Sequence, residues 1–431
     1  MRLLKTSSLT FDDFFDNQIP DYAILSHRWG PKEVLFKEMR KRTAEPGPGL
    51  TKIEKCCQLA ASRGFEWVWV DTCCIDKKSS AELSEAINSM YKWYKRSKLC
   101  YVYLSDVTMT LEEIRLKNTF NKIHSTSDSA GLMARFRNSR WFTRGWTLQE
   151  LIAPFDVIFL DADWNEIGTK RGLALDISDA TNIQTEYLLG KNSIFDASIA
   201  RRMSFASRRV TSRGEDMAYC LLGLFGVNMP LLYGEGEENA FLRLQTEIMK
   251  VSNDESIFAW RSGWLASGML ANKVRYFEHS GTITSHTYSL HGLSAEGPCR
   301  PPCTMSSRGV QLAIPHHSPE KGRVPVYLDC YDEMYNKEGH SRKAAVCIQL
   351  HLREGAAYRT MPGYLHSYDY PERYDLCSQI ALQKSFRCTR VVYVREPTTS
   401  EHFKEVSLSD TAGPFGTTNL NRYLPPPSDN K

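Results

Sequence analysis

Short apolar runs alternate with amphipathic helical patterns over the first 160 residues of the chain. The runs at 22–26, 65–70, 99–104 and 155–160 have the length and the β-branched or aromatic content of buried strands. Between them, apolar positions recur every three to four residues, which is the spacing of one helical face. Strands that alternate with helices predict a mainly parallel sheet flanked by helices, the α/β fold class.

Start and stop signals predict where the intervening helices lie. Thr51 opens a capping box at the start of one helix, and Gly64 predicts its end. Ser79 or Ser80 is predicted to cap a second helix. A third helix is predicted to end before Pro154. The polar, serine-rich stretch at 125–129 predicts a loop or an insertion.

The pattern changes twice after residue 165, which divides the chain into three predicted parts. The α/β domain takes residues 1–165, and a helical extension follows at 166–260. Residues 261–431 form a predicted β-rich C-terminal domain that we expect to be regulatory. The clearest expected helices of the extension are 215–224 and 239–251, and the clearest expected strands of the last part are 324–328, 344–352 and 389–394.

Charge and composition exclude several classes of protein. Lys and Arg total 54 and Asp and Glu total 50, so the net charge of +4 gives no reason to expect a nucleic acid or an anionic membrane as partner. No apolar run approaches the roughly 20 residues that span a bilayer. The N-terminus lacks the form of a secretory signal, so a cytoplasmic protein is expected, and its 12 cysteines are expected to be free thiols.

Polar residues collect where the predicted strands end. In open α/β sheets, ligands bind outside the carboxyl ends of the strands. The residues at those ends are Ser26-His27-Arg28-Trp29-Gly30, the segment from Asp71 to Asp76, and Ser105-Asp106. The sequence therefore predicts a site at this edge of the sheet.

Two other kinds of chemistry, metal binding and cysteine catalysis, have candidate residues in the sequence. Cys299 and Cys303 have a plausible ligand spacing but no second pair at zinc-finger distance, so no metal is predicted. Cys73 or Cys74 with His27 would form a nucleophile and base pair if their strands are adjacent. The sequence offers no recognisable oxyanion hole or third orienting group for that pair.

Three sequence blocks resemble the fungal HET (heterokaryon incompatibility) domain. They are Tyr-Ala-Ile-Leu-Ser-His-Arg-Trp-Gly at 22–30, Trp-Val-Trp-Val-Asp-Thr-Cys-Cys-Ile-Asp at 67–76, and Arg-Gly-Trp-Thr-Leu-Gln-Glu-Leu-Ile-Ala-Pro at 144–154. Segments 215–225 and 230–236 are similar to an extension common in these proteins. The resemblance covers roughly residues 20–260 and implies an effector of cell death after non-self contact.

A more distant likeness is to TIR domains, which share the flavodoxin-like order of strands and helices. Residues 25–30 stand where plant TIR domains have Leu-Ser-Phe-Arg-Gly, and Trp146-Thr-Leu-Gln-Glu150-Leu is similar to the motif that carries their catalytic glutamate. Ser139-Arg140-Trp141 is similar to the approach to that motif. His27 and Trp29 depart from the TIR pattern, as does an insertion of about thirty residues before the glutamate.

The TIR likeness implies cleavage of the nicotinamide–ribose bond of NAD, which would be a substrate, with no cofactor or metal. Glu150 would be catalytic, and Trp146, one helical turn away, would lie on the same helical face. The alternative for Glu150 is a solvated helix carboxylate, and for Arg28 an ion pair with Asp71 or Asp76. The other predicted substrate-binding residues are Ser26, Arg28, Trp29, Gly30, Asp71, Cys74 and Asp76.

A second hypothesis needs no catalysis. The departures at His27 and Trp29 favour a non-catalytic module that associates with itself and recruits partners, as some TIR domains do. The expected partners are NAD under the first hypothesis, and a second copy of the chain and an unidentified non-self or regulatory protein under both.

Overall fold

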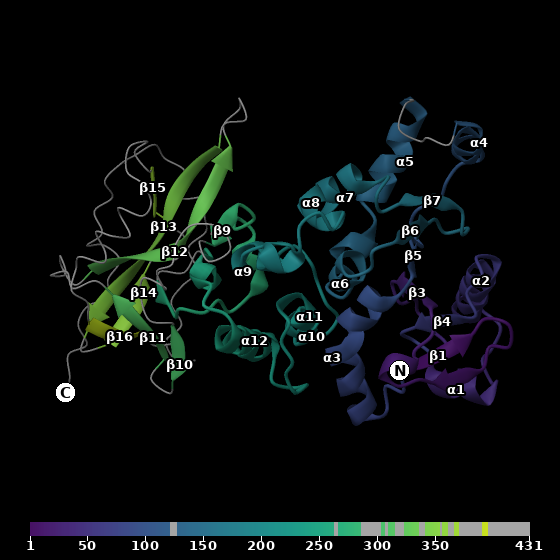
Figure 1. Ribbon diagram of the computed structural model, residues 1–431, viewed down its shortest axis with the longest axis horizontal. Helices are drawn as coiled ribbons and strands as arrows, with labels where there is room; N and C mark the ends of the chain where they lie inside the picture. Colours follow the sequence, from purple (N-terminus) through teal and green to yellow (C-terminus); the bar gives the residue numbers. More distant parts are fainter. Residues whose placement is uncertain are drawn as a thin grey trace.

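The computed structural model describes residues 1–120, 127–262, 266–285, 303–306, 309–314, 323–335, 341–353, 356–360, 366–369 and 390–394. It has an α/β N-terminal domain, then a helical region, then a mostly antiparallel sheet. Figure 1 shows the two sheets at opposite ends of the molecule with the helical region between them. The predicted order of these parts along the chain is confirmed.

A seven-stranded sheet in the order β2-β1-β4-β3-β5-β6-β7 forms the centre of the N-terminal domain. Strands β4, β3, β5 and β6 are parallel, whereas the β1–β2 hairpin and β7 add antiparallel strands at the two edges. The strands are β1 Arg2–Lys5, β2 Phe11–Asp13, β3 Tyr22–His27, β4 Trp67–Val70, β5 Leu99–Tyr103, β6 Val157–Leu160 and β7 Glu166–Thr169. The predicted strands are confirmed as the parallel core of a mixed sheet.

Helices cover both faces of this sheet. They are α1 Phe36–Lys41, α2 Pro48–Ser62, α3 Ser80–Arg96, α4 Leu111–Phe120, α5 Ser127–Arg137 and α6 Thr147–Ile152, with 3-10 turns η1 Asp16–Gln18 and η2 Arg140–Thr143. Figure 1 shows α2 on one side of the sheet and α3 and α6 on the other. Trp69 of β4 is fully buried against Trp93 and Tyr94 of α3, so aromatic packing fixes that layer.

Two helix starts differ from the sequence prediction. Helix α2 begins at Pro48 rather than after Thr51, because proline at the first helical position already has the helical φ angle. Its predicted end is confirmed, with Gly64 at φ 84° two residues beyond Ser62. Ser79 caps α3 by accepting from the Glu82 N–H, as predicted. Part of the expected loop at 125–129 is helical, because α5 starts at Ser127.

The helical extension follows β7. Its helices are α7 Ala174–Thr181, α8 Thr185–Leu188, α9 Ile199–Ser204, α10 Asp216–Tyr219, α11 Leu222–Phe225 and α12 Glu237–Val251, with 3-10 turns η3 Ile194–Asp196, η4 Glu255–Phe258 and η5 Val274–Phe277. The single helix predicted at 215–224 is two short helices, and the one predicted at 239–251 is α12. Strand β7 pairs with β6, so the sheet continues past residue 165, and the three-part division of the chain stays a prediction.

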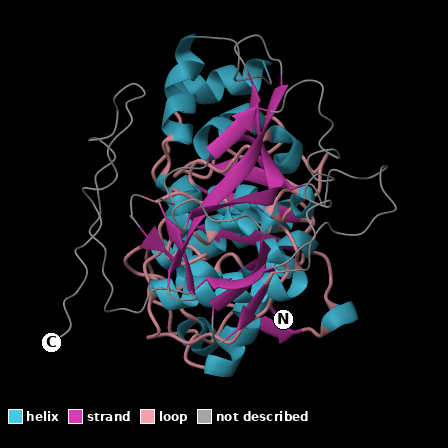
Figure 2. Cartoon of the chain, turned by 90° about the vertical axis from the view of Figure 1, so that its left-hand side faces the viewer, coloured by secondary structure: helices cyan, strands magenta, loops and turns pink. Residues whose placement is uncertain are grey.

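The C-terminal sheet has the strand order β10-β11-β16-β14-β13-β12-β9, with β15 beside β13 and β8 beside β14. Figure 2 shows it in front of the helices. Its strands are β8 Ala266–Ser267, β9 Ile283–Ser285, β10 Thr304–Ser306, β11 Gly309–Ile314, β12 Arg323–Tyr335, β13 Ser341–Arg353, β14 Ala356–Thr360, β15 His366–Asp369 and β16 Arg390–Val394. The three predicted strands lie in β12, β13 and β16, whereas Cys299 lies outside the described residues.

Within the described ranges, no helix has the length and apolar content needed to cross a membrane.

Candidate functional site

The ends of the central parallel strands bring the predicted polar residues to one edge of the sheet. Ser26 and His27 are the last residues of β3, and they pair with Val102 and Tyr103 of β5. Asp71 directly follows β4, which pairs with β3 on its other side. Because side chains alternate along a strand, Ser26 and His27 point to opposite faces of the sheet. Each face therefore has its own polar cluster.

Glu150 lies inside the fold, on the same face as Ser26. Its residue is only 8% exposed, and its Oε2 accepts a short hydrogen bond from Ser26 Oγ. The same hydroxyl accepts from the indole Nε1 of Trp141 at 2.9 Å. The alternative of a solvated helix carboxylate is wrong, because α6 turns this side chain toward β3.

The pKa of Glu150 is raised from 4.5 to about 8. Burial is the main cause, and the hydrogen bond from Ser26 opposes it. Tyr94 is also hydrogen-bonded to Glu150, and its hydroxyl donates to the Leu25 carbonyl at 3.1 Å. The hydrogen bond with Tyr94 also opposes the rise in the pKa of Glu150, so burial outweighs both hydrogen bonds.

The indole that is hydrogen-bonded to Ser26 belongs to Trp141. Trp141 is buried and lies in η2, where Ser139 caps the turn and donates to Asp106 at 2.7 Å. Trp146 is hydrogen-bonded to Asp216 of the extension. The signal for Trp141 was present in the Ser139-Arg140-Trp141 triplet, which sequence reasoning treated only as the approach to the motif.

Two buried cations hold α6 in place. At its C-terminal end, Lys170 Nζ donates to the carbonyls of Leu151, at 3.2 Å, and Pro154. At its N-terminal end, Arg209 Nη1 donates to the carbonyl of Arg144 at 2.9 Å and to Thr147 Oγ1 at 3.1 Å. Burial lowers the pKa of Lys170 to about 8 and that of Arg209 to about 10. Sequence reasoning found neither residue, because both lie beyond the recognised motifs.

Three guanidinium groups gather near the ends of β3 and β5. The pKa of Arg28 is lowered, first by desolvation and then by the nearby charges of Arg140 and Arg144, while Asp106 opposes them. Arg28 Nε is buried and has no hydrogen-bond partner among the described residues. In that part of the chain, no ion pair joins Arg28 to Asp71 or Asp76. Arg140 pairs with Asp106 at 3.2 Å, so the charge left over near Arg28 is positive, as an anion such as phosphate requires.

His27 heads the polar cluster on the other face of the sheet. Its Nε2 lies 3.8 Å from Asp71 Oδ1 and 3.9 Å from Glu33 Oε2. Burial lowers the pKa of His27 to about 4, although both carboxylates oppose that shift. Lys52 pairs with Glu33 at 2.5 Å, which neutralises that carboxylate. The imidazole is therefore neutral, and the cluster is a buried network of charges around it.

Trp29 and Asp71 form the outer part of that cluster. Trp29 Nε1 donates to Asp71 Oδ2 at 2.7 Å, and Lys77 Nζ lies 3.3 Å from the centre of the indole ring. Trp29 is 48% exposed, so one aromatic surface is presented at the edge of the sheet. The backbone N–H of Gly30 donates to Glu33 at 2.5 Å.

The remaining predicted residues have structural contacts. Cys74 Sγ accepts from the Val70 N–H, and the thiol of Cys73 is directed at the Val70 carbonyl. The pKa of Cys73 is raised well above 9 by its hydrogen bond with Cys74 and by burial, which disfavours a thiolate nucleophile. Asp76 accepts from the Lys78 N–H within a turn. No group of three or more metal-binding side chains occurs in the described ranges.

Comparisons with known proteins agree with the sequence blocks. Residues 22–150 match the family model of the heterokaryon incompatibility protein (HET), and residues 239–291 match a domain of unknown function, DUF8212. Over 240 residues, or 55% of the chain, the sequence is 45% identical to the vegetative incompatibility protein HET-E-1 of Podospora anserina. The match covers 17% of that protein's length, so the chain corresponds to a minor part of it. No solved structure matches the chain. The chain therefore contains a heterokaryon incompatibility (HET) domain in residues 22–150.

Proposed function

We propose that this protein is a cytoplasmic cell-death effector of non-self recognition whose N-terminal domain hydrolyses NAD at a TIR-like site. The observation that supports the chemistry is the position of Glu150. Its carboxyl group is held by Ser26, itself held by Trp141, at the carboxyl end of a parallel strand. Ligands of α/β sheets bind at that edge. The likeness to a vegetative incompatibility protein supports the biological setting.

The reaction breaks the bond between the ribose C1′ and the nicotinamide nitrogen, and water supplies the new C1′–O bond. The electrons of the broken bond leave with nicotinamide, so the products are nicotinamide, ADP-ribose and one proton. Positive charge develops on the ribose in the transition state. An ionised Glu150 would stabilise that charge, and fixed electrostatics of this kind commonly contribute ~3–4 kcal/mol per group. The anion site of Arg28, Arg140 and Arg144 would hold the pyrophosphate.

Glu150 must lose its proton to act in this way. A pKa of about 8 leaves it mostly protonated in the free protein at neutral pH. A cationic nicotinamide ring nearby would favour the carboxylate, since an opposite charge lowers the pKa of an acid. We therefore expect kcat/KM to rise with pH, with an apparent pKa near 8 for the free protein.

Nicotinamide release from NAD by the full chain tests the proposal. Glu150→Gln keeps the acceptor for Ser26 but cannot ionise, and we expect it to lower turnover at least ~100-fold. Glu112→Gln, which changes an exposed helical glutamate of the same domain, is the matched control and should leave turnover unchanged. Equal turnover in wild type and Glu150→Gln would refute the enzymatic proposal.

The burial of Glu150 favours a second candidate function. A carboxyl group that is 8% exposed needs an opening before substrate reaches it. In this second proposal the domain does not catalyse and instead associates with itself and recruits a partner. Glu150→Gln should then leave toxicity in cells intact, whereas a variant that prevents self-association should abolish it.

Residues beyond the sheet are proposed to regulate the domain. Gly145 N–H donates to the Val210 carbonyl and Val210 N–H to that of Thr143, so the extension forms a backbone bridge beside α6. A movement of the extension would therefore reach the helix that carries Glu150. A tethered form with the extension fixed by a designed cross-link should lose toxicity while the unlinked chain keeps it.

A further inference from the structure

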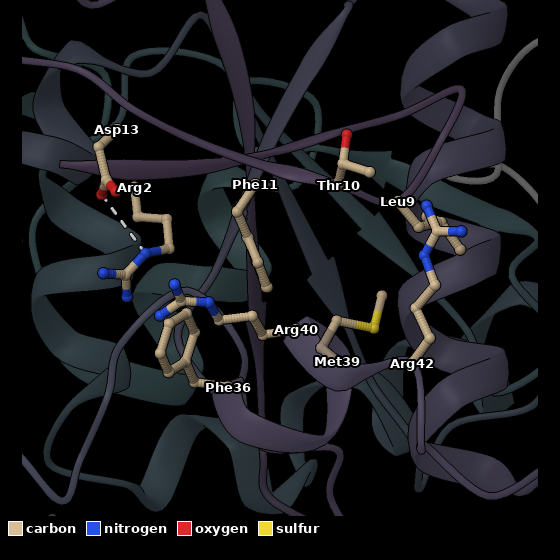
Figure 3. Close-up of a pocket in the computed structure, with 9 residues that line it drawn as sticks. All are labelled: Arg2, Leu9, Thr10, Phe11, Asp13, Phe36, Met39, Arg40 and Arg42. Atoms are coloured by element: carbon tan, nitrogen blue, oxygen red, sulfur yellow. Dashed lines mark ion pairs between the residues drawn. The ribbon is translucent and has the colours of Figure 1, made fainter.

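Arginines line a pocket between the β1–β2 hairpin and α1, but they do not converge on one point. Figure 3 shows Arg40 on one side of Met39 and Arg42 on the other. Arg2, the third arginine of the pocket, forms an ion pair with Asp13 at 3.4 Å. The arginines beside α6 differ, because a hydroxyl group is aimed at one of them.

That hydroxyl belongs to Ser212 of the helical extension. Arg144 Nη1 donates to Ser212 Oγ at 3.0 Å, across 68 residues of sequence. Ser212 is exposed and lies in the segment 211–214, which is neither helix nor strand. A phosphate on this hydroxyl would add about two negative charges and three acceptor oxygens next to a guanidinium group.

Backbone contacts fix the segment that carries Ser212. The Val210 N–H donates to the Thr143 carbonyl at 2.8 Å, and the Gly145 N–H donates to the Val210 carbonyl at 2.9 Å. A Cβ atom on Gly145 would lie 2.5 Å from Thr211 Cγ2, so the glycine allows this close approach. The position of Ser212 therefore depends on main-chain pairing as well as on its own hydrogen bond.

The charge beside Ser212 is positive. Arg144 and Arg213 form no ion pair in the part of the chain that the structure describes. The next two acids along the chain already have donors. Glu215 accepts from two backbone N–H groups at 2.9 and 3.2 Å, and Asp216 accepts from a tyrosine hydroxyl at 2.9 Å. A phosphate on Ser212 would therefore have an uncompensated arginine as its partner.

Arg144 connects Ser212 to the Glu150 site. Burial is the main cause of the raised pKa of Glu150, and the charge of Arg144 is among the effects that oppose it. The pKa of Arg28 is lowered by desolvation, then by Arg140 and Arg144. The charge of Arg144 thus reaches both groups. A phosphate paired with Arg144 would cancel that charge at the edge of the sheet.

We propose that Ser212 is a phosphorylation site and that its phosphate pairs with Arg144. A protein kinase transfers the γ-phosphoryl group of ATP. The bond between Ser212 Oγ and that phosphorus forms, the bond from the phosphorus to the β–γ bridging oxygen breaks, ADP leaves and the hydroxyl proton is released. The phosphate then competes with the pyrophosphate of NAD for Arg144, a consequence that rests on the proposed function. Phosphorylation switches the domain off.

Mass spectrometry of the full chain purified from fungal cells tests the modification. A phosphate on Ser212 is expected, and Ser212→Ala should lose that phosphorylated peptide. A chain without phosphate on Ser212 overturns the proposal.

Phosphorus NMR of the full chain with phosphoserine incorporated at position 212 tests the pairing. The second pKa of a phosphoserine is about 6, and a nearby cation should lower it by about 0.5 unit or more. Arg144→Gln should return this pKa toward about 6. Arg208→Gln, which changes an exposed arginine paired with Glu278, is the matched control and should keep the lowered value. Equal effects of the two variants overturn the pairing.

Nicotinamide release by the phosphorylated and unmodified chains tests the switch. Phosphorylation should lower kcat/KM about 10-fold or more, the effect of losing one charged hydrogen bond, and mainly through KM. An unmodified chain without turnover refutes the proposed function, while the NMR result still decides whether the phosphate pairs with Arg144. Equal turnover of the two chains overturns the switch and leaves the proposed function standing.

Discussion

Trp141 Nε1 donates to Ser26 Oγ at 2.9 Å, across 115 residues of sequence. The hydroxyl has one proton, and it is used for the bond to Glu150. The direction of both bonds is therefore fixed, since the indole can only donate and the hydroxyl must accept from it. Trp141 sets the orientation of Ser26, and Ser26 in turn sets the position of the buried carboxyl group.

Trp141→Phe should destabilise the domain and disturb the site. Phenylalanine keeps the aromatic packing on Phe142 and Phe159 but leaves the Ser26 hydroxyl without its donor. A buried polar group that loses its partner costs about 1–3 kcal/mol. Urea denaturation measures this cost, and nicotinamide release measures the effect on the proposed chemistry.

Trp69→Phe is the matched control for that substitution. Trp69 is equally buried, yet its indole N–H has no hydrogen-bond partner among the described residues. The free energy of unfolding that Trp69→Phe loses should therefore reflect packing alone. If Trp141→Phe is no more destabilising than Trp69→Phe, the hydrogen bond from the Trp141 indole to Ser26 contributes nothing to the free energy of unfolding.

The pH dependence of stability should report the proton on Glu150. Its pKa is about 8 in the fold and about 4.5 when solvated, so the folded chain holds the extra proton between those values. This contribution to stability is complete below pH 4.5 and is lost as the pH rises through 8. The free energy of unfolding of wild type should fall relative to Glu150→Gln by an amount on the order of 5 kcal/mol over that range.

Chemical denaturation of both proteins between pH 5 and pH 9 measures the difference. Glutamine does not titrate, so all other groups cancel in the comparison. A difference that stays constant with pH would show that the carboxyl group is already ionised in the fold.

Arg209→Lys should loosen the start of the Glu150 helix. The lysine keeps the charge but cannot reach the Arg144 and Phe205 carbonyls and Thr147 Oγ1 together. We expect a loss of about 1–3 kcal/mol in the free energy of unfolding. The neighbouring Arg208→Lys changes an exposed residue paired with Glu278, and it should cost less than about 1 kcal/mol. Similar losses at the two positions would argue against a role for Arg209 in holding α6.

The parallel core of the sheet could be predicted because its strands are continuous apolar runs. The buried strands at 67–70 and 157–160 consist wholly of apolar residues. Strands β2 and β7 escaped prediction because each lies at an edge of the sheet and has few apolar residues in its three or four positions. Edge strands are half-solvated, so their sequences resemble loops.

The site was also predicted only in part, because sequence motifs marked some of its residues and not others. Motif likeness identified Ser26 and Glu150, which the fold brings together. It placed Trp146 on the helical face of Glu150, and it did not identify Trp141 as the indole that contacts Ser26. Trp146 is hydrogen-bonded to Asp216. Helical spacing identifies neighbours on one helix only. Trp141 lies in η2, a separate turn before α6, so that spacing could not identify it. Lys170 and Arg209 act on backbone carbonyls, and no sequence pattern marks such contacts.

Gly223→Ala should separate the extension from the N-terminal domain. A Cβ atom at Gly223 would lie 2.1 Å from Tyr91 Cβ and 2.5 Å from its Cγ, so α11 and α3 cannot keep their present contact. Overpacking of this kind typically costs about 1–3 kcal/mol. Gly131→Ala is the contrasting variant, because it lies within helix α5 near only the flexible end of Arg135, and it should stabilise the chain by about 0.5–1 kcal/mol.

The functional effect of Gly223→Ala distinguishes two roles of the extension. If the extension restrains the domain, the weakened contact with Tyr91 should increase toxicity in cells. If the extension is needed to hold the Glu150 helix through Arg209, toxicity should fall together with NAD turnover, because α6 would lose its support. Limited proteolysis should show faster cleavage within the extension in both cases. Unchanged proteolysis and unchanged stability would mean that Tyr91 moves aside and that the contact does not couple the two parts.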